Sequence, residues 1–198
     1  MLSEAMTLHE HHHDSDSTDV FGFWLYIMTD CILFSCLFAT FLVLNLPGAP
    51  GPALKNYIDL PYVLLETFFL LASNFTYCLA ILNLYQDKFV KVQGWLAFSF
   101  LLGASFIFME VTEFAHLAGK GFRWDLSGKS SSFFTLVGTH GLHVSCGLFW
   151  ILLMIFQVPL IKDKNTVKRR MTYLGLFWNF LDIVWIFVFT VVYLMGAM

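Results

Sequence analysis

Charged side chains are scarce in this 198-residue chain. Asp, Glu, Lys and Arg together make up 13% of it, whereas hydrophobic residues make up 58%. Soluble domains usually carry about 25% charged residues, so a chain of this composition has too little polar surface to stay dissolved. The net charge of −3 is small, and no basic patch suggests a nucleic-acid partner. The composition therefore points to a membrane protein.

Cysteine is also rare, and none of the four cysteines forms a C-x-x-C pair. The chain thus lacks the paired-cysteine pattern of redox and metal sites. No phosphate-binding loop, nucleophile–base arrangement or internal repeat is visible in it. Proline is missing near the centres of the long apolar runs, which argues against a small transporter built on broken helices. Any chemistry must come from a few polar residues.

What the sequence does contain is five long apolar runs. They cover residues 20–46, 61–84, 95–117, 133–161 and 171–195. About 20 apolar residues, at ~1.5 Å of rise each, let a helix cross the bilayer. The predicted fold is therefore all-α: residues 20–198 form an integral membrane bundle of five transmembrane helices. The polar segments between the runs are too short to fold as soluble domains.

The N-terminal tail, residues 1–19, is predicted to be disordered. It holds four histidines, at positions 9, 11, 12 and 13. Such a cluster could bind a transition metal, but a solvated tail without a specific site is favoured. The tail is not a cleavable signal, because it has no basic region and the apolar run after it is too long.

Lysine and arginine predict the orientation of the chain. Seven of them follow the second and fourth runs, and four lie on the opposite side. Positive charge favours the cytoplasm. The N-terminus is therefore predicted to be cytoplasmic and the C-terminus periplasmic.

Polar side chains interrupt the apolar runs. They are Asp30, Glu66, Glu110, Glu113, His116, His140, His143, Asn179 and Asp182. A carboxylate at the bilayer centre costs about 2.5–3.5 kcal/mol, and all 11 lysines and arginines lie outside the runs. The acids are therefore expected to be protonated, or hydrogen-bonded to His, Asn, Thr or Trp of neighbouring helices.

Spacing and depth predict that six of these side chains form one cluster. They are Glu66, Glu110, Glu113, His116, His140 and His143. Those on the third and fourth runs recur every three residues, so each set shares a helix face. All six fall in the outer half of the membrane in the predicted orientation. The alternative is that each one separately faces a loop, water or a partner subunit.

A metal centre is a weaker interpretation of the same residues. Glu113 and His116 have the E-x-x-H spacing of di-iron bundles, but those sites need two such motifs and further glutamates. His140 and His143 could ligate haem or copper, which makes a self-contained membrane redox protein the alternative function. A proton relay of Glu and His is also open. We assign no catalytic, cofactor-binding or metal-binding residue.

Five stretches, taken in order, resemble a known family. They are FGFWLYIMTDCILFSCLFAT, LLETFFLLASNFTY, FMEVTEFAHL, VGTHGLHVSCGLFW and FWNFLDIVWIFVFTVVYLMGAM. Over residues 20–198 the chain resembles subunit III of the haem-copper oxidases, most closely the cytochrome o ubiquinol oxidase form. The family commonly has histidine where this chain has Asn179, so no role that requires histidine is carried over to that position.

The resemblance implies an accessory, non-catalytic subunit of a proton-pumping quinol oxidase in the bacterial inner membrane. The complex would oxidise ubiquinol and reduce oxygen to water. Haems and copper are expected in subunit I, with no cofactor in this chain, and the expected partners are subunits I, II and IV and phospholipids. The six-residue cluster, together with Asp182, is then expected to be structural or to line a lipid-holding cleft.

The two functions differ in whether this chain itself carries the haem or metal that absorbs visible light. If the chain is an accessory subunit, it should be colourless once separated from its complex, while the intact complex keeps its haem absorption. A visible spectrum and a metal analysis of the isolated chain check this. Stoichiometric haem, iron or copper would instead support a redox protein that uses His140 and His143.

Overall fold

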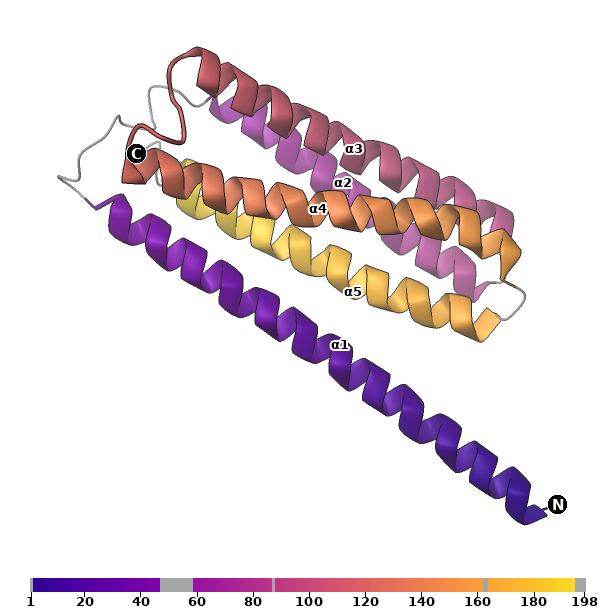
Figure 1. Ribbon diagram of the computed structural model, residues 1–198. Helices are drawn as coiled ribbons and strands as arrows, with labels where there is room; N and C mark the ends of the chain where they lie inside the picture. Colours follow the sequence, from indigo (N-terminus) through magenta and orange to yellow (C-terminus); the bar gives the residue numbers. More distant parts are fainter. Residues whose placement is uncertain (1, 47–58, 87, 162–163, 195–198) are drawn as a thin grey trace. The chain divides into compact units, whose positions relative to one another are not determined.

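The computed structural model describes residues 2–46, 59–86, 88–161 and 164–194, and for residues 2–19 the backbone alone. The elements, shown in Figure 1, are α1 (Leu2–Leu44), α2 (Leu60–Tyr85), α3 (Phe89–Gly119), α4 (Gly128–Leu160), α5 (Lys164–Val188) and the π-helix η2 (Phe189–Leu194). Among the described residues, five helical segments are long and apolar enough to cross a membrane. The all-α class and five helices able to span a membrane are thus confirmed for this part of the chain, and the orientation stays a prediction.

Helix α1 belongs to two units of the structure, one ending at Cys36 and one beginning at Leu37. Its apolar segment is Val20–Leu44. The backbone is helical from Leu2, so the helix runs through the tail for which the sequence predicts disorder. Extending an existing helix adds one hydrogen bond per residue without a new nucleation step. The division into a tail and a membrane domain stays a prediction.

In the second unit, α2 to α5 form a ring of four helices. Each contacts the next, and α5 closes the ring against α2 (Figure 1). Because α4 ends at Leu160 and α5 begins at Lys164, the connection is far too short to return along a long helix. Short connections of this kind make consecutive helices antiparallel.

Three helices begin well before the apolar runs from which they were predicted. Helix α3 starts at Phe89 rather than Trp95, α4 at Gly128 rather than Phe133, and α5 at Lys164 rather than Met171. Lysine, arginine and glutamine are good helix formers, and their long side chains reach the membrane surface. Charged segments that were predicted as connections are therefore partly helical.

Local signals in the connection between α3 and α4 end one helix and start the next. Gly121 has a φ of 84°, and the N–H of Phe122 donates to the Leu117 carbonyl at 3.0 Å. This is the usual glycine-terminated end of a helix. At the start of α4, the Ser127 N–H donates to Ser130 Oγ at 3.1 Å and the Ser130 N–H donates back to Ser127 Oγ at 3.3 Å. Such a capping box satisfies two N–H groups at once.

Polar side chains inside the ring bond across helices. The hydroxyls of Ser73 on α2 and Ser99 on α3 each donate to the other residue's carbonyl, both at 2.9 Å. The hydroxyl of Tyr77 donates to the Met171 carbonyl of α5 at 2.7 Å. Small and hydroxyl-bearing residues are the usual links between helices in lipid, where no hydrophobic effect drives association.

Trp178 of α5 fills the space between three helices. A Cβ added at Gly147 of α4 would lie 2.7 Å from its Cζ3, and one added at Gly103 of α3 would lie 3.2 Å from its Cζ2. Two bare stretches of backbone thus accommodate one buried indole ring. Gly147 is among the residues that allow close helix approach in lipid, so the tight packing of α4 against α5 depends on it.

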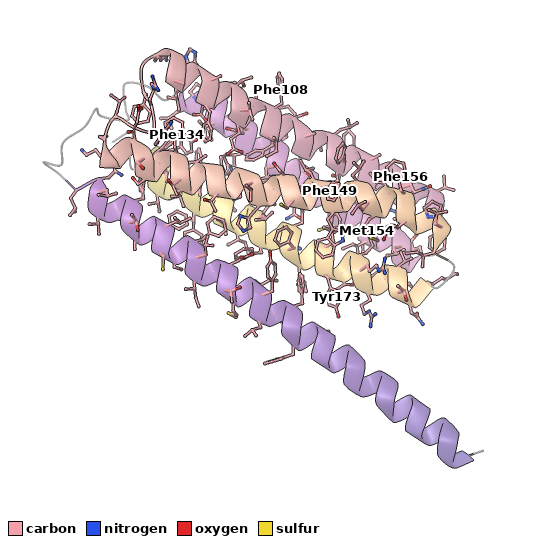
Figure 2. The ribbon with its side chains drawn as sticks, in the orientation of Figure 1. Phe108, Phe134, Phe149, Met154, Phe156 and Tyr173 are labelled. Atoms are coloured by element: carbon pink, nitrogen blue, oxygen red, sulfur yellow. The ribbon has the colours of Figure 1, made fainter. Side chains whose placement is uncertain are left out.

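The outside of the ring is apolar. Figure 2 shows Phe108, Phe149 and Phe156 on α3 and α4; all three are exposed, whereas Met154 of α4 is fully buried. Exposed apolar surface on this scale marks a protein that contacts lipid or other proteins. The bundle therefore exposes large apolar side chains where a soluble protein would expose polar ones.

The glycine contact of Trp178 is testable with a matched pair. A Cβ at Gly147 meets the ring at 2.7 Å, whereas one at Gly138 of α4 meets Phe114 Cε2 at an ordinary 3.8 Å. Gly147→Ala should lower the free energy of unfolding by about 1–3 kcal/mol relative to Gly138→Ala. Titration with a denaturing detergent, followed by helical circular dichroism, measures both. Equal values would show that the indole is not tightly packed there.

Candidate functional site

Three glutamates from two helices meet inside the ring. Glu66 of α2 is 0% exposed, and Glu110 and Glu113 of α3 are 3% and 8% exposed. Their charges are close enough to act on one another. Within the described residues, the carboxyl oxygens of Glu66 and Glu110 have no hydrogen-bond partner. Full ionisation would place like charges together in apolar surroundings, which is costly.

Glu113 is bonded to the end of the last helix. The hydroxyl of Tyr193 donates to Glu113 Oε2 at 3.0 Å. Tyr193 is fully buried and lies in η2, where the chain winds with the wider π-helical turn. This change of winding rotates the side chains of η2 relative to those of α5, and π-helical turns are frequent at functional sites. The bond ties η2 to α3.

The carboxyl of Glu110 lies directly against the backbone of α4. A Cβ added at Gly141 would lie 2.5 Å from its Oε1 and 2.7 Å from its Oε2. Any larger residue at this position would therefore displace the carboxyl. Gly141 lies between His140 and His143 in the sequence. The part of the H-x-x-H segment that lies against Glu110 is therefore its glycine.

A pocket of about 320 Å³ opens beside Glu113. Its lining residues are Asp59, Tyr62, Thr112, Glu113, His116 and Leu117. The Tyr62 hydroxyl lies 2.8 Å from Thr112 Oγ1 and 3.1 Å from the Met109 carbonyl oxygen, which joins the two helices that form the pocket. Glu113 thus contacts both the pocket and, through Tyr193, the buried end of the last helix.

The two histidines of α4 have different surroundings. His140 is fully buried, with ring centroids 5.1 Å from Trp185 and 6.1 Å from Phe106. His143 is half-buried, and its Nδ1 lies 2.8 Å from the carbonyl oxygen of Thr139 in the preceding turn. The first is packed among aromatic rings, and the second is bonded to its own helix.

Asp182 lies apart from the glutamates. It lies near Asn74 and Cys78 of α2, which follow Glu66 by eight and twelve residues. At 1.5 Å of rise per residue, this is ~12–18 Å further along the helix. Asn74 also donates to Asn179 Oδ1 at 2.7 Å, so asparagine fills a hydrogen-bonding position where the resemblance expects histidine.

The structure therefore brings together fewer of the predicted residues than their spacing implied. The three glutamates come together, His116 lines the pocket, and the α4 histidines pack nearby in separate environments. Sequence reasoning missed Tyr193 and Asp59, because no pattern marks a π-helical turn and Asp59 precedes its apolar run. Among the described residues, no group of three or more His, Cys, Asp and Glu side chains could hold a metal ion.

A family model described as cytochrome c oxidase subunit III matches residues 1–197. The chain belongs to this family. It is 54% identical to the cytochrome bo(3) ubiquinol oxidase subunit 3 of Pseudomonas aeruginosa over 193 residues, which cover 96% of this chain and 91% of that protein. The resemblance found in the sequence is confirmed.

Two further relatives extend the comparison. The chain is 44% identical to the cytochrome bo(3) ubiquinol oxidase subunit 3 of Buchnera aphidicola subsp. Baizongia pistaciae over 180 residues, 91% of this chain and 93% of that one. It is 40% identical to the cytochrome c oxidase subunit 3 of Bacillus sp. (strain PS3) over 176 residues, 88% of this chain and 84% of that one. Members of the subunit III family belong to oxidase complexes, so a self-contained membrane redox protein is not favoured.

The bond between Tyr193 and Glu113 makes a quantitative prediction for this subunit III chain. Tyr193→Phe removes the donor and should lower the free energy of unfolding by about 1–3 kcal/mol. Tyr85→Phe is the control, because Tyr85 is exposed and its ring contact with Lys168 survives the change. The measurement is again titration with a denaturing detergent.

A double-mutant cycle isolates the bond. In a Glu113→Leu background, Tyr193→Phe should lose most of its effect, since the acceptor is already gone. An equal cost of Tyr193→Phe in both backgrounds would mean that the hydroxyl acts through some other contact.

Proposed function

We propose that this chain is the accessory third subunit of a terminal quinol oxidase. The complex oxidises ubiquinol, reduces oxygen to water and pumps protons. The observation that carries the proposal is the family match over residues 1–197, together with relatives at 54% and 44% identity that are named as subunit 3 of ubiquinol oxidases. The chain supports the catalytic subunit and does not itself perform the oxidation.

In this proposal the haems and copper belong to subunit I. The partners are subunits I, II and IV and membrane phospholipids. The exposed phenylalanines of α2 and α3, among them Phe68, Phe75 and Phe108, support partners within the membrane. Lipid tails or the helices of other subunits can cover such faces, whereas water cannot.

The complex lies in the bacterial inner membrane, with the N-terminus cytoplasmic and the C-terminus periplasmic. The support for this orientation is the cluster of Lys164, Lys168, Arg169 and Arg170 at the start of α5, because positive charge favours the cytoplasmic side. Glu113 and its pocket then lie at the opposite, periplasmic end of the bundle.

The polar residues of the spans hold the bundle together in this proposal. Glu113 accepts a hydrogen bond from η2, Glu110 packs on α4, and Asn74 of α2 donates to Asn179 of α5. Such contacts fix how the helices sit against one another. The bundle so fixed presents its apolar outer faces to subunit I and to bound phospholipids.

Purification through this chain tests the proposal. With an affinity tag on it and mild detergent extraction, a haem-containing subunit and quinol oxidase activity should co-purify. Cells that lack subunit I provide the control and should yield the tagged chain without haem. Recovery of a stable, isolated monomer from normal cells would contradict the proposal.

A further inference from the structure

We propose that the outer face of α2 and α5 around Asn179 binds a transmembrane helix of another oxidase subunit, which supplies a hydrogen-bond acceptor in the middle of the membrane. The proposal rests on the quinol oxidase complex proposed above, and it names the surface and the chemistry of one contact within that complex. We call this surface the amide face; its residues are Leu71, Asn74 and Phe75 of α2 and Asn179 and Ile183 of α5.

Two asparagines join α2 to α5 on the outside of the ring. Asn74 Nδ2 donates to Asn179 Oδ1 at 2.7 Å, and this bond is exposed. Asn179 is itself exposed, and its own Nδ2 donates to no group among the described residues. By contrast, the exposed hydroxyl of Thr190 donates to the Ile186 carbonyl of the preceding turn at 2.8 Å. Asn179 therefore presents a donor that this part of the chain does not satisfy.

The amide pair lies near the centre of the membrane. Asn179 follows Arg170 by nine residues, which is ~13 Å along a helix, and the hydrocarbon core is ~30 Å thick. Asn74 lies close to the middle of its span, Leu60–Tyr85. At this depth neither water nor a lipid head group reaches the amide, and acyl chains carry no acceptor. The group that covers Asn179 is therefore a protein helix rather than lipid.

The side chains around the amide pair define what kind of helix fits. Leu71, Phe75 and Ile183 are 42%, 66% and 54% exposed, so the amide face is bulky. An asparagine side chain is short and reaches a partner only when the facing helix comes close, which in lipid requires small residues. A second copy of this chain would bring the same bulky face and does not fit. The partner helix carries Gly, Ala, Ser or Thr at this depth, and its acceptor is a hydroxyl or a backbone carbonyl oxygen.

A photoreactive residue at position 183 tests the contact in the intact oxidase complex. Ile183 is exposed and lies one turn from Asn179 on the same helix face, so replacing it with p-azidophenylalanine leaves both asparagines in place. Irradiation should join this chain to one other subunit, at a transmembrane segment that contains a small residue. The same probe at Trp124, which is exposed in the connection between α3 and α4, should not label that segment.

Three variants measure the hydrogen bond itself. Asn179→Leu removes the donor and should raise the rate at which this chain leaves the complex in detergent about three- to tenfold. Asn74→Leu removes the bond within the bundle but keeps the Asn179 amide for the partner, so its effect should be smaller. Thr190→Val removes a hydroxyl that bonds to its own helix and should leave the rate unchanged.

The outcomes separate this contact from the proposed function. If no other subunit co-purifies with the parent chain, the proposed function fails and the contact with it. If the complex is intact but the probe at position 183 reacts only with lipid, with a second copy or within its own chain, the docking proposal alone is overturned. Equal dissociation rates of Asn179→Leu and Asn74→Leu would also overturn it, because the amide would then serve only the bundle. The probe decides the question if Asn179→Leu does not assemble.

Discussion

A carboxyl group inside an apolar bundle must meet a cation or be kept neutral and hydrogen-bonded. In this chain every lysine and arginine lies outside the apolar runs, so the first solution requires a cation from elsewhere. In the described structure, Glu113 accepts a hydrogen bond from Tyr193. Glu66 and Glu110 are also buried, 0% and 3% exposed, and their carboxyl oxygens have no hydrogen-bond partner among the described residues. The arrangement of α2, α3, α4 and η2 depends on how these three acids are accommodated.

Glycines make that accommodation sterically feasible. Gly141 leaves room on α4 for the carboxyl of Glu110, and Gly103 and Gly147 leave room for the indole of Trp178. Glycines of the same bundle thus make room for a buried indole ring at one level and for a buried carboxyl at another. Because a packed interior transmits small displacements, a methyl group added at one of these glycines should be felt at the neighbouring helix as well.

The sequence could predict those features of the fold that depend on the residues of a single helix. Five apolar runs predict five spans, and small residues in the fourth run predict close packing. Two things depend on tertiary contacts. The π-helical turn that brings Tyr193 to Glu113 has no local signature, since VVYLM reads as ordinary apolar helix. Three-residue spacing puts His140 and His143 on one face, yet only the packed structure shows that His140 lies among aromatic rings while His143 bonds to Thr139.

In the oxidase complex, a partner subunit could place a cation beside these acids. An experimental structure of the purified complex, at a resolution that shows side chains, measures this directly. The account predicts that Tyr193 is within hydrogen-bonding distance of Glu113, and that no lysine or arginine of any subunit lies within about 4 Å of the three carboxyls. An arginine or lysine from subunit I bonded to Glu66 or Glu110 would contradict it, because the acids would then be ionised interface residues.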